Sequence, residues 1–188
     1  AIVCSLVGSE MCIRDSGGDF DGDQQTFPKI FQENGYQTAV IGKWHLGTTP
    51  TGFDYSKVLT NWGGQGTYFH PQFSINGKQT VREKHRHSTK VIEDDCIDWL
   101  SNRDTTKPFM LMYQFKAPHR DWRPDSIYHD LFSDFDFPEP STFNDKYEGR
   151  IAASENMMEI ENHLNRRDLK LIAPSGMSRR DSMRWLSY

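Results

Sequence analysis

The chain has 188 residues, of which 36% are hydrophobic and 13% aromatic, so it can bury the core of roughly one domain and is unlike a disordered chain. Its net charge of −4 gives it no general attraction to nucleic acid or to anionic lipid. No apolar run approaches the roughly 20 residues that span a membrane, so the composition indicates a globular domain or a piece of one.

The first sixteen residues, AIVCSLVGSEMCIRDS, differ in character from the rest of the chain. They carry no initiator Met and no basic stretch ahead of an apolar one, so they do not form a signal peptide. Residues 1–7 have the composition of a short buried strand, but the segment resembles the spurious ends of reading frames assembled from metagenomes. We expect residues 1–16 to be atypical and non-native, and residues 17–188 to be part of one domain, truncated at both ends.

A helix and a strand are predicted next. Residues 26–34 (TFPKIFQEN) have Thr26 as N-cap, a proline in the first turn and a glycine after the last residue, which are typical of a short helix. Residues 36–41 (YQTAVI) predict a buried strand, and Gly42 begins the loop after it. This order of elements is typical of an α/β sheet.

Residues 48–77 are rich in Gly, Pro, Asn and aromatic residues and show no helical periodicity. So long a stretch without a helix is usually functional surface. It ends in a hairpin turn predicted at Asn76 and Gly77. The KHRH run that follows suggests a solvated basic patch, with a zinc site on His85 and His87 as the weaker alternative.

Residues 88–102 predict a second helix, with Ser88 as its cap. Its aspartates, Asp94, Asp95 and Asp98, are expected on the solvated face, and Cys96 is expected to be an inert core thiol.

After this helix, residues 109–115 predict an apolar strand covered on both faces. Residues 125–145 are acidic, aromatic and rich in proline, which predicts a long surface excursion. Residues 147–164 predict one further helix.

Two predicted strands are each followed by a lysine and a histidine: Lys43 and His45 after the first, and Lys116 and His119 after the second. Ligands of open α/β sheets bind outside the carboxyl ends of the strands. A lysine offers a positive charge and three donors, and a histidine can donate or shuttle a proton. We expect the two strands to be neighbours or near neighbours, roughly parallel, in one sheet. The four residues would then form an anion-binding pocket capable of acid catalysis.

The same segments resemble a known family. GYQTAVIGKWHLG (residues 35–47) closely resembles the second signature of the type I sulfatases of the alkaline phosphatase-like superfamily. KPFMLMYQFKAPHRDW (residues 107–122) resembles the later strand of that family, which ends in an active-site histidine. TPTGFDYSKVLTNWGGQGTYFHPQF, FPEPSTFNDKYEGR and NRRDLKL are similar to the N-acetylglucosamine-6-sulfatase-like members, which act on glycosaminoglycan or mucin sugars.

The resemblance implies a fold, an activity and site residues. The fold would be part of an α/β three-layer sandwich with a mostly parallel central sheet. Lys43 and His45 match family positions that contact the sulfate and the catalytic aldehyde hydrate, and His119 matches the histidine on the sulfate and leaving-group side. Lys116, Arg120 and Trp122 would contact the substrate, a sulfated carbohydrate such as N-acetylglucosamine-6-sulfate. Family members of this kind are usually exported, which implies a periplasmic or secreted parent protein.

The family nucleophile is a formylglycine made within a C/S-x-P/A-x-R motif, and calcium acts as Lewis acid. This sequence contains no such motif: Cys4 is followed by SLVG and Cys12 by IRDS. The acidic motifs that hold the metal in the family are also absent, so we expect an incomplete and inactive piece of a sulfatase catalytic domain. The alternatives are a phosphatase or phosphodiesterase of the same superfamily, and a carbohydrate-binding relic that has lost its catalytic segment.

Overall fold

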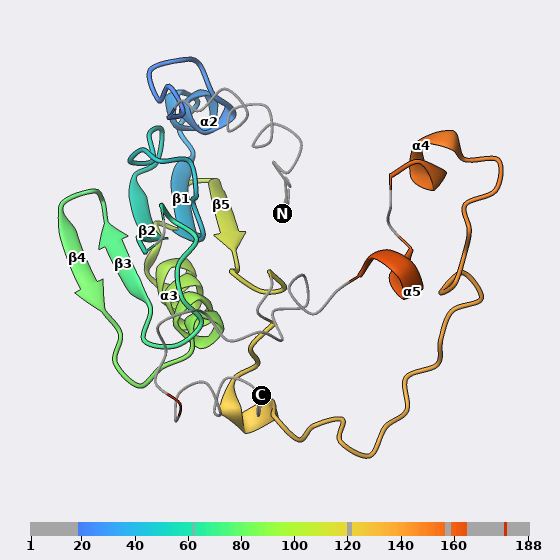
Figure 1. Cartoon of the computed structure of the whole chain (residues 1–188). Helices are drawn as coiled ribbons and strands as arrows, with labels where there is room; N and C mark the ends of the chain where they lie inside the picture. Colours follow the sequence, from blue (N-terminus) through green and yellow to red (C-terminus); the bar gives the residue numbers. More distant parts are fainter. Residues whose placement is uncertain (1–18, 62, 120–121, 157–158, 165–178, 180–188) are drawn as a thin grey trace. The chain divides into compact units, whose positions relative to one another are not determined.

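The computed structural model describes residues 19–61, 63–119, 122–156, 159–164 and 179 (Figure 1). The segment expected to be non-native, residues 1–16, lies outside these ranges. The chain divides into two units, residues 1–118 and residues 119–188. The first unit contains the sheet and the long helix.

The first unit is built on a five-stranded sheet with the order β4-β3-β2-β1-β5. Its strands are β1 (Gln37–Gly42), β2 (Tyr55–Leu59), β3 (Gln72–Ile75), β4 (Gln79–Arg82) and β5 (Phe109–Gln114). β1 pairs in parallel with both β2 and β5, which confirms that the two predicted strands are parallel neighbours. β3 and β4 add an antiparallel hairpin, so the sheet as a whole is mixed. The turn of this hairpin lies at Asn76 and Gly77 as predicted, with φ angles of 50° and 66°.

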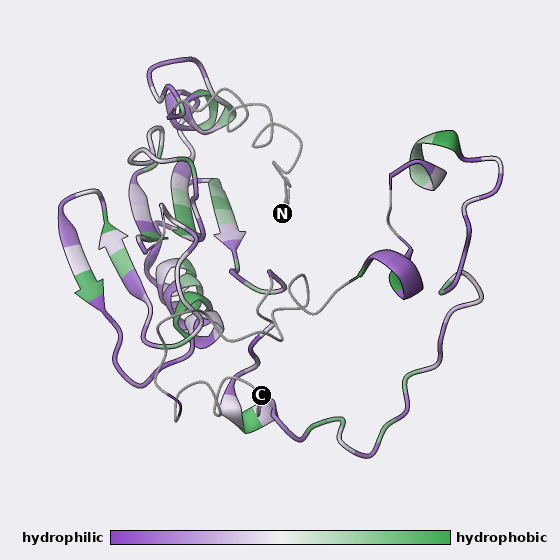
Figure 2. Cartoon of the chain, viewed as in Figure 1, coloured by the Kyte–Doolittle hydropathy of each residue, from purple (hydrophilic) through white to green (hydrophobic). Residues whose placement is uncertain are grey.

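Both faces of the sheet carry apolar clusters, because neighbouring residues of a strand point to opposite faces. Ile41 and Leu59 lie in the cluster on the face covered by α3 (Ser88–Asn102), which contributes Val91, Ile92 and Cys96. Val40 and Val58 lie on the other face, where they meet Met112 and are packed by Phe27 of α2 (Phe27–Glu33), Trp44 and Phe53. Figure 2 shows hydrophobic residues on β1, on β5 and on α3. The predicted α/β class is therefore confirmed.

The helix ends differ in detail from the prediction. Thr26 occupies the N-cap position of α2, but its side chain makes no capping hydrogen bond. α3 is capped by His87, not by Ser88: the Nδ1 atom of His87 accepts the backbone N–H of Thr89 at 3.3 Å. His87 is only 5% exposed, so the KHRH run is not solvated throughout. The imidazole of His87 also packs against the rings of Tyr68 and Phe69.

β5 is less covered than its apolar sequence predicts. Only Met112 is buried, whereas Phe109 and Tyr113 are each 40% exposed. The reason is that β5 lies at one edge of the described sheet, next to β1 alone. The expectation that both of its faces are covered is therefore wrong for the part of the chain described.

In the second unit, residues 125–145 form the expected surface excursion, with a single 3-10 helix at Ser126–Tyr128. The helix predicted over residues 147–164 is wrong: two short helices occur there, α4 (Ile151–Ser154) and α5 (Ile160–His163). Ile151 is 78% exposed. Helices are marginal without a surface to pack on, and these short segments bury little.

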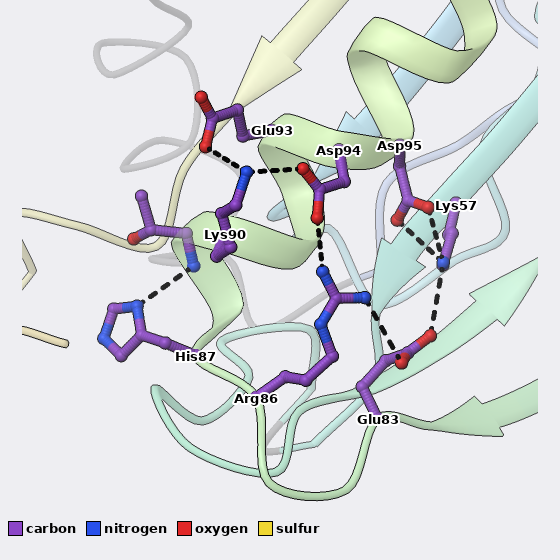
Figure 3. Close-up of polar contacts among 9 residues, drawn as sticks. Lys57, Glu83, Arg86, His87, Lys90, Glu93, Asp94 and Asp95 are labelled. Carbon is purple, nitrogen blue, oxygen red and sulfur yellow. Dashed lines mark hydrogen bonds and ion pairs between the residues drawn. The ribbon is translucent and has the colours of Figure 1, made fainter. Parts of the chain in front are cut away.

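A buried lysine links β2 to α3 (Figure 3). Lys57 is 7% exposed, and its Nζ lies 2.7 Å from Asp95 Oδ2 and 3.6 Å from Glu83 Oε1. Burial raises the pKa of Asp95, although the hydrogen bond from Lys57 acts in the opposite direction. Asp95 is therefore an ion-pair partner and not, as predicted, part of a solvated face. Two charges removed from water require such pairing, since an unpaired buried ammonium is costly.

The neighbouring charges lie nearer the solvent. Arg86 contacts Asp94 at 2.5 Å and Glu83 at 3.7 Å (Figure 3). Lys90 donates a hydrogen bond to Asp94, and this bond holds the pKa of Asp94 below its usual range. Because these side chains are about two-fifths exposed or more, apart from Glu83, each pair contributes little to stability.

Candidate active site

The carboxyl ends of β1 and β5 lie side by side, with Gly42 paired to Gln114. Gly42, the last residue of β1, has a φ of 120°, and a Cβ placed on it would lie 1.7 Å from the carbonyl oxygen of Gln114. Only glycine permits this approach. It lets the backbone N–H of Lys43 donate to the same oxygen at 2.8 Å. The backbone of Lys43 is therefore bonded to Gln114, the last residue of β5, and Lys116 follows Gln114 by two residues.

His45 is held from two sides. Trp44, its neighbour, packs into the core against Phe53, with ring centroids 5.9 Å apart. On the other side lies Gly64, where an added Cβ would be 2.7 Å from the backbone nitrogen of His45. His45 is 7% exposed and has a φ of 29°, an uncommon conformation for a non-glycine residue. Such backbone geometry is often found at functional sites.

The glycine-rich loop also reaches Lys116. The Nζ atom of Lys116 donates to the carbonyl oxygen of Gln65 at 3.3 Å, and the side chain is 8% exposed. Gly64 and Gln65 are consecutive, and one contacts His45 while the other contacts Lys116. The structure therefore brings a histidine and a lysine from different strands to the same short loop.

Residue-level prediction did not identify the role of this loop. Residues 48–77 were expected to be functional surface, but the individual contacts of Gly64 and Gln65 depend on pairing between distant segments. The available signal was the glycine-rich string NWGGQGT, since glycine often marks a close approach of two backbones.

This arrangement suits an anion. The two lysines follow adjacent parallel strands, at the sheet edge where ligands of α/β proteins bind. Charge-assisted hydrogen bonds from ammonium groups to anionic oxygens are stronger than neutral ones, and partial burial strengthens them further. The imidazole of His45 adds a group that can donate a proton.

Three predicted site residues follow the first unit. His119 and Trp122 belong to the second unit, where the backbone N–H of Trp122 donates to the carbonyl oxygen of His119 at 3.3 Å. Trp122 is 50% exposed, with a φ of 46°. Arg120 lies outside the described residues. A pocket that His119 shares with Lys43 remains a prediction.

The described residues do not fit a metal site. Within the described ranges, no group of three or more His, Cys, Asp or Glu side chains could hold a metal ion. The Nδ1 atom of His70 accepts the backbone N–H of His85 at 2.8 Å, and the Nδ1 atom of His87 serves as the helix cap. The zinc alternative on His85 and His87 therefore finds no support. The calcium that the resemblance implies finds no ligand set there either.

Comparison with known proteins identifies the family. A family model described as Sulfatase matches residues 8–175, so the chain belongs to the sulfatase family. It is 46% identical over 179 residues to an N-acetylglucosamine-6-O-sulfatase of Bacteroides thetaiotaomicron, covering 93% of this chain and 32% of that protein. It is 29% identical over 136 residues to the N-acetylglucosamine-6-sulfatase of Capra hircus, covering 65% of this chain and 24% of that protein.

A solved structure of a protein bound to its substrate, D-glucosamine-2-N,6-O-disulfate, matches with a TM-score of 0.74 and 42% identity. That match covers 92% of this chain and 35% of the other. The chain thus spans about a third of the length of the Bacteroides relative and of this solved protein. The fold and the family agree with the sequence-based predictions.

Proposed function

We propose that the chain is the sulfate-binding part of a sulfuric ester hydrolase that acts on sulfated carbohydrate, such as N-acetylglucosamine-6-sulfate units. The observation that carries the proposal is the loop in which Gly64 contacts His45 and Gln65 contacts Lys116. Family membership and the printed names of the relatives support the choice of a sulfate ester on an amino sugar.

The proposed roles of the two lysines follow from their charge, and those of the remaining residues from the resemblance to the sulfatase family. Lys43 and Lys116 bind the sulfate oxygens and stabilise negative charge that develops on them during cleavage. His45 holds a proton near the same oxygens. His119 donates a proton to the sugar oxygen that leaves when the ester bond breaks. Arg120 and Trp122 contact the sugar.

The chain by itself lacks a nucleophile for the family reaction. No C/S-x-P/A-x-R segment occurs in its sequence, and the described residues offer no calcium ligand set. We therefore expect it to bind sulfate esters without turning them over. Hydrolysis is assigned to the longer protein of which this chain is a part.

A periplasmic or secreted location is proposed for that longer protein, by analogy with exported family members. Among the described residues, no helix is long and apolar enough to cross a membrane.

The test is a binding titration of the chain with glucosamine-6-sulfate, glucosamine-6-phosphate and glucosamine, followed by NMR. We expect the sulfate ester to bind with a dissociation constant of about 1 mM or weaker, and unmodified glucosamine not to bind. Lys43→Ala should weaken binding several-fold. Lys107→Ala is the matched control, because Lys107 is exposed and precedes the opposite end of β5.

Equal binding of glucosamine with and without sulfate would contradict the proposal and favour a carbohydrate-binding relic. Tighter binding of the phosphate ester would favour the phosphatase alternative. A longer protein that contains this chain and hydrolyses N-acetylglucosamine-6-sulfate would support the assigned activity.

A further inference from the structure

We infer that Tyr68 is a positioning residue that holds the Lys116 ammonium at the candidate site; this inference rests on the proposed function for the role of Lys116. The Nζ atom of Lys116 lies 5.0 Å from the centroid of the Tyr68 ring. Tyr68 is 4% exposed and Lys116 is 8% exposed. An ammonium over the face of an aromatic ring is attracted by the ring quadrupole, and the attraction grows when water is excluded.

The same loop holds the ammonium at a second point, through the carbonyl oxygen of Gln65 at 3.3 Å. Both contacts are with neutral groups, so they orient the ammonium and stabilise its charge without cancelling it. Lys57, the buried lysine of β2, contacts two carboxylates.

Tyr68 is itself anchored to the start of α3. Its carbonyl oxygen accepts the backbone N–H of Ser88 at 2.7 Å, and its ring stacks on that of His87 with centroids 5.5 Å apart and an interplanar angle of 25°. A β-bridge between Phe69 and His87 flanks this contact. The ring is thus fixed by a helix terminus, which is a more rigid support than a loop alone.

The burial of Tyr68 distinguishes positioning from direct contact. A side chain that is 4% exposed offers almost no surface to a sugar. Its effect on sulfate binding is therefore expected to pass through Lys116.

The test compares Tyr68→Phe, which keeps the ring, with Tyr68→Leu, which removes it. In each variant of the 188-residue chain, the rate of acetylation of Lys116 by acetic anhydride is followed by peptide mass spectrometry. We expect Lys116 to react about tenfold faster in Tyr68→Leu, since the ring no longer shields and stabilises the ammonium. Tyr68→Phe should react within about twofold of the unchanged chain. Lys57 is the internal control, and its rate should stay the same.

A fluorinated ring separates shape from charge. Pentafluorophenylalanine at position 68 keeps the size of phenylalanine but reverses the ring quadrupole, so Lys116 should again react faster than in Tyr68→Phe. Equal Lys116 rates in the phenylalanine and pentafluorophenylalanine variants would overturn the inference. This comparison decides the question even if Tyr68→Leu unfolds the chain and raises the Lys57 rate as well.

The sulfate titration adds a functional measurement. Tyr68→Leu should weaken binding of glucosamine-6-sulfate several-fold, and Tyr68→Phe should not. If the unchanged chain binds no sulfate ester, the proposed function fails, while the acetylation rates still decide whether Tyr68 positions Lys116.

Discussion

Replacing Gly42 by alanine should disrupt the junction between β1 and β5 on which the candidate site depends. The new Cβ would lie 1.7 Å from the carbonyl oxygen of Gln114 and 2.7 Å from its carbonyl carbon. Both atoms belong to the backbone, so the two strand ends would have to move apart by more than an ångström. That movement would break the 2.8 Å hydrogen bond from Lys43 to Gln114.

The expected cost has three parts. A positive φ costs an alanine about 1–2 kcal/mol, overpacking against a neighbouring strand costs about 1–3 kcal/mol, and a lost hydrogen bond costs about 1 kcal/mol. Gly42→Ala should therefore lower the free energy of unfolding by about 3–6 kcal/mol, against a total of about 5–15 kcal/mol for a typical domain.

Gly35→Ala is the matched control. Gly35 has a φ of 81°, but no atom lies within 4 Å of its added Cβ, so only the backbone term applies. It should cost about 1–2 kcal/mol. In urea unfolding followed by tryptophan fluorescence, the midpoints of the two variants should differ by about 1 M or more. The amide of Lys43 should also exchange faster with solvent in Gly42→Ala. Equal midpoints for the two variants would refute the close approach of β5 to Gly42.

Three further predictions concern charge, thiol reactivity and activity. Asp95→Ala should destabilise the chain by about 2–3 kcal/mol in urea unfolding, because it leaves Lys57 buried without its closer carboxylate. Asp98→Ala, at an exposed site of the same helix, should change the stability little. Similar effects of the two substitutions would show that the buried pair is not formed. Cys96 is 3% exposed and burial raises its pKa to about 12, so iodoacetamide at pH 8 should label Cys96 only after unfolding; a labelled Cys96 peptide from the folded chain, found by mass spectrometry, would contradict its burial. The same raised pKa means that the folded chain binds a proton which the unfolded chain has lost above about pH 9, so the contribution of Cys96 to stability should fall as the pH rises towards 12, and Cys96→Ala should remove this part of the alkaline loss. The purified chain with calcium should release no sulfate from N-acetylglucosamine-6-sulfate or an aryl sulfate; turnover that His119→Ala abolishes would reveal a nucleophile that the sequence motif does not show.

Sequence patterns correctly predicted the elements whose formation depends on neighbouring residues in the chain. α3 begins at Ser88 and ends at Asn102 as predicted, because fifteen residues with helical apolar spacing favour one structure strongly. β1 and the hairpin turn at Asn76 were also recoverable, since a continuous apolar run and an Asn-Gly pair are local features. The family could be recognised from the sequence because each of its motifs is a continuous segment of the chain.

β2 was missed because its pattern depends on tertiary structure. Its sequence, YSKVL, places a lysine in the middle of the strand, and that lysine is buried only because Asp95 of α3 and Glu83 pair with it. From the sequence alone, a lysine at this position predicts an exposed residue and not a buried strand. The same pairing explains why Asp95 was wrongly expected on a solvated face.

In the candidate site too, some features could be predicted from the sequence and others depend on the tertiary structure. By itself, the sequence determined which residues could bind an anion, because Lys43, His45 and Lys116 follow strands that local patterns identify. Only the tertiary structure decided how they are held. Gly64 contacts His45 across 18 intervening residues, and Gln65 and Tyr68 contact Lys116 across about 50. These contacts join segments that are distant in the sequence, so they depend on how the loops are placed at the carboxyl ends of the strands, which no local pattern encodes.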